Sequence, residues 1–370
     1  MRIALMGIRG IPARYGGFET FAEELAPRLA SRGHDVTVYG RSNNVPRRRN
    51  GTLYKGVRLV VLPTVPLKYF DTVAHTYLSA LHAVFRNRYD VVLMMNAANA
   101  PFAWLPRLRG TRVVLNVDGI ERLRRKWNRL GQMYYGMGER LARWVPDAIV
   151  SDARVIQEYF LRVHRASSVF IAYGAEAGRV ESSRVLDTLG LRPRDYLLYV
   201  TRFEPENNPD RVIEAFARVR TDKRLVIVGD APYSSAYKAR LAVLAARDAR
   251  VLLPGFIYGE GYRELQSHAY CYVQATEVGG THPALLEAMG AGNCVIANGT
   301  PENIEVLGGC GLIYRKNDTD DMTRQLTRAL EDPALVSELG RRAMERVRLE
   351  YSWDEVTRKY EALFKRLVDA

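Results

Sequence analysis

Short apolar, β-branched runs alternate with longer segments of helical periodicity along the whole chain, and this alternation limits the possible folds more than any other feature. Runs such as RIALMG (2–7) and RLVIVGD (224–230) are apolar almost throughout, which predicts strands covered by helices on both faces. Successive strand, helix and strand segments form right-handed parallel units. The pattern therefore predicts the α/β class with doubly wound parallel sheets.

Thirteen strands are expected, in two series. The first series is 2–7, 35–40, 57–62, 90–95, 112–117, 147–152 and 168–173, and the second is 195–201, 224–230, 250–255, 270–275, 293–298 and 311–315. A chain of 370 residues is too long for one ordinary core, so each series predicts a Rossmann-like domain. We expect an N-terminal domain over 1–180, a C-terminal domain over 190–351, and an amphipathic helix over 352–370 that packs back on the first domain. Ligands of such sheets bind beyond the carboxyl ends of the strands, which predicts a site in a cleft between the two domains.

The stretch EVGGTHPALLEAMGAG (277–292) predicts a helix whose start faces a ligand. Pro283 suits the first turn of a helix, where its missing N–H goes unused, and Thr281 or His282 is the expected N-cap. The exposed N–H groups of a helix start attract anions, phosphate above all.

The same stretch also carries two glycines and a carboxylate. Gly279 and Gly280 let the backbone approach a ligand closely, whereas Glu287, about one turn into the helix, cannot serve an anion. A nucleotide has both the anionic group and the ribose hydroxyls that these features fit.

The sequence lacks the motifs of other nucleotide-binding proteins and of metal sites. The first turn, GIRGIPARYGG (7–17), has no G-x-G-x-x-G, and Arg41 follows the second strand where an NAD enzyme has an acid. No Walker lysine motif is present. The Asp318-Thr319-Asp320 triplet precedes a helical pattern, which favours a helix cap over a metal site. Cys271, Cys294 and Cys310 lack C-x-x-C spacing and are expected to be buried thiols.

Several segments, in this order and spacing, resemble a family 4 retaining glycosyltransferase of the GT-B fold. They are YGGFETF (15–21), VTRFEPENNPDRVIEAF (200–216), RLVIVGDAP (224–232), VLLPGFI (251–257), EVGGTHPALLEAMGAG (277–292) and YSW (351–353). Within that family, NVDGIERLRRKW (116–127) and TPENIEV (300–306) resemble the bacterial rhamnosyltransferase subgroup of capsule and exopolysaccharide assembly. The resemblance implies two Rossmann-like domains that face each other across a cleft.

The resemblance implies a donor site in the C-terminal domain. Arg202 matches the arginine that clamps the donor diphosphate, a role suited to a guanidinium fork. The family usually has a lysine five residues later, where this chain has Asn207. Phe256 and Ile257 match the loop that holds the base, although a core role for Phe256 is an open alternative.

Glu287 matches the second glutamate of the family's E-x7-E signature, which binds the ribose. The first glutamate falls at Gly279 here, so either Glu277 reaches the sugar from a remodelled loop or its task is lost. Gly279, Gly280, Thr281 and His282 complete the expected donor side.

In the N-terminal domain, Gly16 and Gly17 match the glycine pair that faces the diphosphate, where a side chain would block the donor. Asp118 stands where related enzymes often have a histidine against the outer hydroxyl of a hexose. A 6-deoxy sugar lacks that hydroxyl, so Asp118 is compatible with rhamnose; it could also orient the acceptor or cap a turn. Asn96, which follows another strand, is a second acceptor-side candidate.

The basic charge lies entirely in the first half of the chain. Residues 1–180 contain 28 Lys and Arg against 13 Asp and Glu, a net +15, whereas 181–370 contain 26 against 28, a net −2. Arg47-Arg48-Arg49 and the segment ERLRRKWNRL (121–130) carry much of it. Arg124 and Trp127 in that segment are further acceptor-side candidates, with Trp127 expected at a membrane interface. An anionic membrane surface or an anionic substrate fits this distribution, and nucleic acid has no supporting motif.

Together these features predict a metal-independent glycosyltransferase that needs no cofactor, retains anomeric configuration, and carries Arg202, Asp118 and Glu277 as its catalytic candidates. The expected donor is a dTDP- or UDP-linked sugar, with L-rhamnose from dTDP-rhamnose first, and the expected acceptor is a saccharide or a polyprenyl-diphosphate-linked glycan. A UDP- or GDP-hexose transferase, a nucleotide-sugar epimerase of the same fold and a non-enzymatic binding module are the alternatives. We expect a cytoplasmic protein, peripheral on the inner face of the membrane. No run approaches the ~18 apolar residues of a spanning helix.

Overall fold

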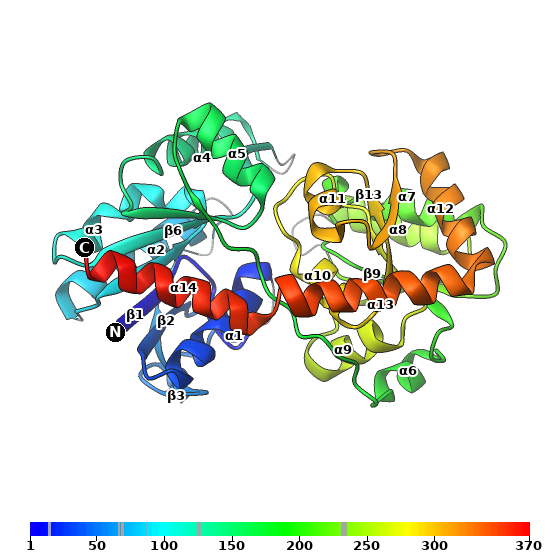
Figure 1. Ribbon diagram of the computed structural model, residues 1–370, viewed down its shortest axis with the longest axis horizontal. Helices are drawn as coiled ribbons and strands as arrows, with labels where there is room; N and C mark the ends of the chain where they lie inside the picture. The colour runs from blue at the N-terminus through cyan, green and yellow to red at the C-terminus, as the bar shows by residue number, and fades with distance from the viewer. Residues whose placement is uncertain (14–15, 66, 68–69, 87, 124–126, 231–234) are drawn as a thin grey trace. The chain divides into compact units, whose positions relative to one another are not determined.

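The computed structural model describes residues 1–13, 16–65, 67, 70–86, 88–123, 127–230 and 235–370. The chain divides into two compact units (Figure 1). Unit 1 contains residues 1–123, 127–173 and 353–370, and unit 2 consists essentially of 174–352. The last helix therefore belongs with the first half of the chain.

Unit 1 is built on an eight-stranded sheet in the order β3-β4-β2-β1-β5-β6-β7-β8. Its strands are β1 (Arg2–Met6), β2 (Asp35–Arg41), β3 (Leu53–Tyr54), β4 (Val57–Leu62), β5 (Val91–Met95), β6 (Arg112–Val117), β7 (Ala148–Ser151) and β8 (Val169–Phe170). All pairs are parallel except β3 with β4. The carboxyl ends of the seven parallel strands therefore lie along one edge.

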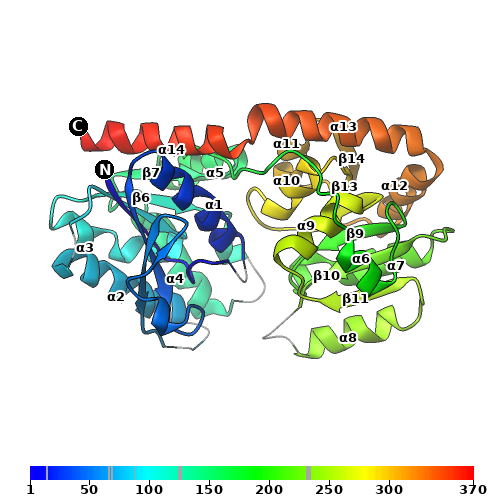
Figure 2. The same ribbon diagram turned by 90° about the horizontal axis from the view of Figure 1, so that it is seen from below.

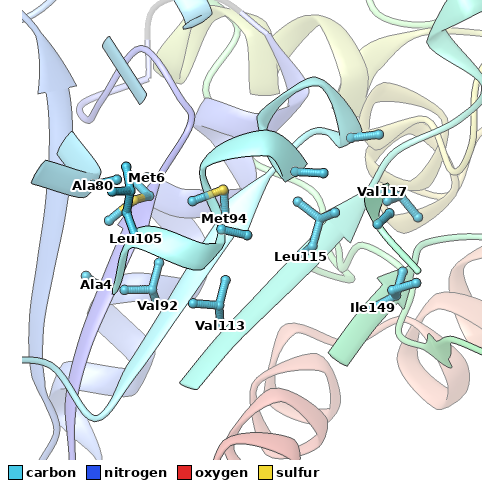
Figure 3. Close-up of a cluster of buried hydrophobic side chains, with 14 of the residues drawn as sticks. Ala4, Met6, Ala80, Val92, Met94, Leu105, Val113, Leu115, Val117 and Ile149 are labelled. Carbon is cyan, nitrogen blue, oxygen red and sulfur yellow. The ribbon is translucent and has the colours of Figure 1, made fainter. Parts of the chain in front are cut away.

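Helices cover both faces of this sheet. They are α1 (Gly17–Ser31), α2 (Asp71–Arg86), α3 (Trp104–Arg107), α4 (Arg129–Leu141), α5 (Arg154–His164) and α14 (Trp353–Val368), with the short 3-10 helices η1 (Arg47–Arg49), η2 (Ala97–Phe102) and η3 (Glu121–Leu123). One face packs against α2 to α5, and α1 and α14 lie on the other (Figure 2). The core of the first face comes from alternate strand residues such as Val92, Met94, Val113 and Leu115 (Figure 3). Alternation arises because successive strand side chains point to opposite faces.

The C-terminal helix α14 completes the other face of unit 1. Its apolar stripe of Trp353, Val356, Tyr360, Leu363 and Phe364 is buried, as its spacing predicts. The rings of Phe21 in α1 and Tyr360 in α14 meet edge to face at 5.4 Å between centroids. The Tyr360 hydroxyl accepts a hydrogen bond of 2.7 Å from the buried Asn116 amide of β6.

Unit 2 is built on a six-stranded parallel sheet in the order β11-β10-β9-β12-β13-β14. Its strands are β9 (Tyr196–Val200), β10 (Arg224–Val228), β11 (Val251–Gly255), β12 (Cys271–Gln274), β13 (Cys294–Asn298) and β14 (Gly311–Tyr314). Its helices are α6 (Arg184–Leu189), η4 (Pro205–Asn207), α7 (Pro209–Ala217), α8 (Ser235–Ala245), α9 (Gly259–His268), α10 (Pro283–Gly290), α11 (Pro301–Leu307), α12 (Thr319–Glu331) and α13 (Pro333–Glu350).

Each of the thirteen expected strands is present, which confirms the predicted fold class. The two-residue strand β3 escaped the pattern, because a two-residue strand has no periodicity to detect. The three cysteines are buried thiols, as expected. Burial raises the pKa of Cys271 well above its ordinary value. Among the described residues, no helix combines the length and the apolarity needed to cross a bilayer.

Candidate functional site

Arg202 follows the central strand β9 on a backbone that is fixed from two sides. Its carbonyl accepts a 2.8 Å hydrogen bond from the Asn207 side-chain amide, and the Asn207 carbonyl accepts one of 2.5 Å from the Tyr199 hydroxyl. The Arg202 side chain is 33% exposed, and its Nη1 lies 4.0 Å from Oε1 of Glu204. A partly exposed guanidinium on a fixed loop at the carboxyl edge of the sheet is suited to bind an anion.

Asn207, which stands where the resembled family has a lysine, is only 4% exposed. Its amide holds the loop from Glu204 to Asn208 by the bond to Arg202. Asn207 thus fixes the conformation of the loop, and it adds no positive charge to the site.

The glycine of the RLVIVGD motif allows β9 and β10 to end close together. A Cβ on Gly229 would lie 1.7 Å from the Thr201 carbonyl oxygen, so no other residue fits without moving the backbone that carries Arg202. The glycine of this motif is therefore explained by close packing against the backbone next to the arginine loop.

The loop after β12 is tied to the arginine loop. The Glu277 amide donates to the Glu206 carbonyl at 2.9 Å. The Thr276 hydroxyl accepts from the Gln274 side-chain amide at 2.6 Å and lies 3.0 Å from Nε2 of His282. Because β9 and β12 are neighbouring strands, the structure brings this loop beside Arg202.

His282 occupies the N-cap position of α10, but the expected side-chain cap is absent. The imidazole turns to Thr276 instead, and Thr281 is 3% exposed. The predicted N-cap position is therefore confirmed for His282, and its side chain makes no cap hydrogen bond there. A Cβ on Gly279 would lie 2.5 Å from Cε1 of His282. Gly279 therefore makes room for the imidazole, a reason that the sequence pattern did not show. Gly280, the second glycine of the pair, lies in the same loop and is buried.

Glu287, in the second turn of α10, has a fixed orientation. The Tyr262 hydroxyl from α9 donates a hydrogen bond to its carboxylate, and the Gln266 side-chain amide donates to the Tyr262 oxygen at 3.0 Å. Burial and the negative charge of Glu287 raise the pKa of Tyr262 well above its ordinary value. Sequence reasoning missed Tyr262, because no local spacing relates it to a carboxylate 25 residues away.

The loop between β11 and α9 carries two stacked aromatic rings. Phe256 and Tyr258 lie 5.5 Å apart between centroids with an interplanar angle of 24°, and they are 36% and 48% exposed. Phe256 is therefore no core residue, which excludes the alternative kept open above. Ile257, between them, is half-buried, and a Cβ added at Gly261 of α9 would lie 3.4 Å from its Cγ2.

On unit 1, Gly16 is the N-cap residue of α1 and Gly17 is its first residue, as their pairing predicts. Gly16 has a φ of 101°, and a Cβ there would lie 2.4 Å from Oε2 of Glu19. The Glu19 carboxylate in turn accepts a 2.8 Å hydrogen bond from the Arg9 amide. Gly16 is thus required by the turn itself, whatever else faces it.

Asn96 and Asp118 follow the neighbouring strands β5 and β6. Asn96 has a φ of 76°, and its side chain caps η2 by accepting from the Ala98 amide at 2.9 Å, so it has a structural role. Asp118 is half-buried beside Tyr173. Burial, with the charges of Asp118 and Asp152, raises the pKa of Tyr173 well above its ordinary value. The carboxylate of Asp118 therefore faces a protonated phenol.

Two further acceptor-side candidates are Arg124 and Trp127. Arg124 lies outside the described residues. The Trp127 ring packs against the buried Tyr135 ring at 5.1 Å between centroids with a tilt of 45°, and its Nε1 donates to Glu121 at 3.4 Å. Trp127 therefore packs within its own unit, and its interfacial role stays a prediction.

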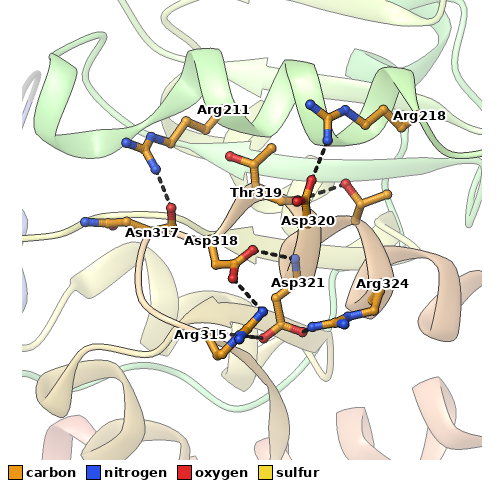
Figure 4. A network of polar contacts seen from close by, with 10 residues as sticks. Arg211, Arg218, Arg315, Asn317, Asp318, Thr319, Asp320, Asp321 and Arg324 are labelled. Atoms are coloured by element: carbon orange, nitrogen blue, oxygen red, sulfur yellow. Dashed lines mark hydrogen bonds and ion pairs between the residues drawn. The ribbon is translucent and has the colours of Figure 1, made fainter.

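The D-x-D triplet forms a helix cap, as predicted. The Asp318 side chain accepts from the Asp321 amide at 2.8 Å at the start of α12, and Arg315 pairs with Asp318 at 2.7 Å (Figure 4). Asp320 pairs with Arg218 at 2.6 Å. Both carboxylates are engaged with this chain's own groups.

The two sequence-defined halves of the chain match two family models. Residues 194–332 match the model described as glycosyl transferases group 1, and residues 1–176 match one described as a domain of unknown function (DUF1972). The first match contains Arg202, Glu277 and Glu287.

Two curated relatives are named for exopolysaccharide and O-antigen chains. An exopolysaccharide phosphotransferase of Streptomyces coelicolor is 29% identical over 191 residues, 48% of this chain and 20% of that protein. The O-antigen chain mannosyltransferase B of Escherichia coli is 23% identical over 177 residues, 47% of this chain and 46% of that protein. The chain thus matches about a fifth of the first relative's length and less than half of the second's.

Solved structures share the whole fold. The sucrose-phosphate synthase of Thermosynechococcus elongatus superposes with a TM-score of 0.84 at 20% identity, covering 99% of this chain and 98% of that one. Anabaena HepE in complex with UDP gives 0.78 at 15% identity, covering 99% and 100%. These likenesses confirm the GT-B fold, and with the group 1 match they support a glycosyltransferase.

Proposed function

We propose that this protein is a glycosyltransferase that moves a sugar from a nucleoside diphosphate to a saccharide acceptor in the synthesis of a bacterial surface polysaccharide. One observation carries the proposal: the carboxyl edge of unit 2 presents three separate recognition elements within the segment that matches group 1 transferases. Arg202 on its fixed loop suits a diphosphate, the oriented Glu287 suits ribose hydroxyls, and the stacked Phe256 and Tyr258 suit a base.

For the donor we propose dTDP-L-rhamnose. Asp118, in place of a histidine, suits a 6-deoxy sugar that has no outer hydroxyl to be bound. A UDP- or GDP-hexose is the second candidate, because the structural neighbour HepE is described in complex with UDP and with UDP-glucose.

The proposed mechanism is front-face substitution with retention of configuration. Cleavage of the glycosidic bond builds negative charge on the departing diphosphate, and Arg202 stabilises that charge more than it stabilises the ground state. A leaving phosphate oxygen takes the acceptor proton, so the scheme needs no separate base. Asp118 and Glu277 remain the candidates for orienting the acceptor and the transferred sugar.

For the acceptor we propose a saccharide or a polyprenyl-diphosphate-linked glycan, reached at the cytoplasmic face of the membrane. The net charge of +15 over residues 1–180 suits both a diphosphate and an anionic leaflet.

A thermal-shift panel with dTDP, UDP, GDP and ADP tests the donor site. A ligand at a hundred times its Kd stabilises the folded state by about 2.7 kcal/mol. We expect one nucleotide to raise the Tm and Arg202→Ala to abolish that response, with kcat reduced about 100- to 1,000-fold, as when one oxyanion donor is lost.

The matched control is Arg341→Ala, which removes an exposed arginine that forms an ion pair with Glu338 on the same helix, α13. A full nucleotide response in Arg202→Ala contradicts the diphosphate assignment. Turnover of a sugar nucleotide without acceptor, giving an isomer and no free nucleotide, selects the epimerase instead.

A further inference from the structure

The two helical layers of unit 1 differ sharply in what they expose. Large apolar side chains stand in solvent along α2, α3 and α4 and the turn after α4, with exposed fractions of 50–73%; they are Phe85, Trp104, Leu108, Leu130, Met133 and Trp144. On the opposite layer of α1 and α14, Val368 at 38% is the one large apolar side chain exposed among the described residues. Folded proteins scatter such residues singly, so their concentration on one layer indicates an interaction surface.

These side chains belong to one helical layer. α2 packs against α3 and η2, and α4 packs against the other side of that connection through η2 (Figure 2). On α4, Leu130, Met133 and Met137 recur at three- and four-residue spacing, which aligns them along one ridge. We call the outer surface of α2, α3, α4 and the turn through Trp144 the α2–α4 face.

The chain segment that carries the α2–α4 face is cationic. Residues 71–146 contain twelve Lys and Arg and five Asp and Glu. Of those acids, Glu139 is 2% exposed and is neutralised by Arg122 at 3.1 Å, and Asp90 bonds Arg2. Arginines such as Arg109, Arg129 and Arg140 are exposed beside the apolar side chains.

A groove of about 440 Å³ lies at the end of the ridge, between α4 and α5. Arg140, Arg143 and Trp144 line it together with Val163, which is 55% exposed. The Arg143 guanidinium stacks 4.3 Å from the centre of the Trp144 ring. The arginines at this groove suit the phosphate of a lipid headgroup, and the amphipathic Trp144 ring suits the boundary between headgroups and acyl chains.

We propose that the α2–α4 face docks on an anionic phospholipid surface, with Leu130, Met133 and Trp144 in the acyl boundary and the arginines on phosphates. The charge excludes a second copy of this face as the occupant, because two like-charged surfaces repel. The inference deepens the membrane association within the proposed function. It moves the contact from Arg47–Arg49 and Trp127 to α4 and its neighbours.

Vesicle sedimentation of the full chain tests this docking. We expect binding to vesicles of phosphatidylcholine with phosphatidylglycerol, little binding to phosphatidylcholine alone, and a steep loss in high salt. The variant Leu130→Ser/Met133→Ser is expected to lower partitioning about tenfold or more, and Arg140→Gln/Arg143→Gln to remove the preference for anionic vesicles.

The matched control is Leu349→Ser, which removes an equally exposed leucine from unit 2. Equal binding to both vesicle types, or unchanged binding in the ridge variant, overturns the proposal; so does a dimer that the ridge variant disperses. The nucleotide thermal shift separates this result from the donor site. Ridge variants that no longer bind vesicles but keep the nucleotide thermal shift support the docking face. If the protein binds vesicles but no nucleotide changes its Tm, the docking face is supported and the proposed transferase function is contradicted.

Discussion

Tyr262 of α9 holds the carboxylate of Glu287 of α10 by a hydrogen bond from its hydroxyl. A bond to a charged acceptor is worth about 1.5–3 kcal/mol. If Glu287 binds ribose, Tyr262→Phe leaves that carboxylate misoriented, and we expect the KM for the donor to rise about tenfold with little change in kcat. Steady-state kinetics at varied donor concentration measures this split. Tyr196→Phe, which removes a buried hydroxyl bond to the Leu265 carbonyl, is the control and is expected to lower stability without raising KM.

Gly279→Ala tests the space occupied by His282. The added methyl lies 2.5 Å from the imidazole, so either the ring must leave Thr276 or the loop after β12 must shift. We expect the nucleotide thermal shift to fall by at least half while the protein still folds. Gly136→Ala, at a helical position where a Cβ meets open space, is expected to keep the full shift and to stabilise by about 0.4–1 kcal/mol. Equal behaviour of the two variants would show that the loop tolerates the displaced ring.

Asp318→Ala tests whether the D-x-D triplet is only structural. Loss of the cap on α12 is expected to cost about 1 kcal/mol of unfolding free energy, measured by urea denaturation. Transfer activity is expected to stay within about twofold of the parent, because both acids bond the chain itself. If activity falls by more than the fraction of folded protein does, the triplet has a functional role as well as a structural one.

Glu361 of α14 makes stability depend on acid pH. Its contacts with Lys365, His34 and Arg32 lower its pKa to about 2. The folded state thus keeps this carboxylate ionised where the unfolded chain, with an ordinary pKa of about 4.3, takes up a proton. Its contribution is complete above about pH 4.3 and is lost as the pH falls toward 2. We expect Glu361→Gln to be about 1 kcal/mol less stable at pH 7 and equal to the parent near pH 2, with the exposed Glu345→Gln as control.

The strands could be predicted because each is a short apolar run with its own periodicity, and Arg202, Glu287 and Gly16 because each follows a recognisable strand or opens a helix. Tyr262 and the roles of Gly279 and Gly229 could not be predicted, since each depends on an atom brought close by the fold: a carboxylate, an imidazole and a carbonyl. The contact of Trp127 with Tyr135 could not be predicted for the same reason, because an aromatic residue in a basic segment does not show which way its ring turns.

The membership of α14 in unit 1 has a consequence for biosynthesis. On the ribosome the first domain's strands emerge early, yet Phe21 and Asn116 gain their partner Tyr360 only after all of unit 2 has been translated. Until then α1 covers only part of that face of the first sheet, and the apolar surface that α14 buries is open to chaperones or to misassembly. Unit 1 is thus started at the beginning of translation and completed at its end. A product that lacks α14 exposes apolar surface that a finished molecule buries, and this difference distinguishes the two.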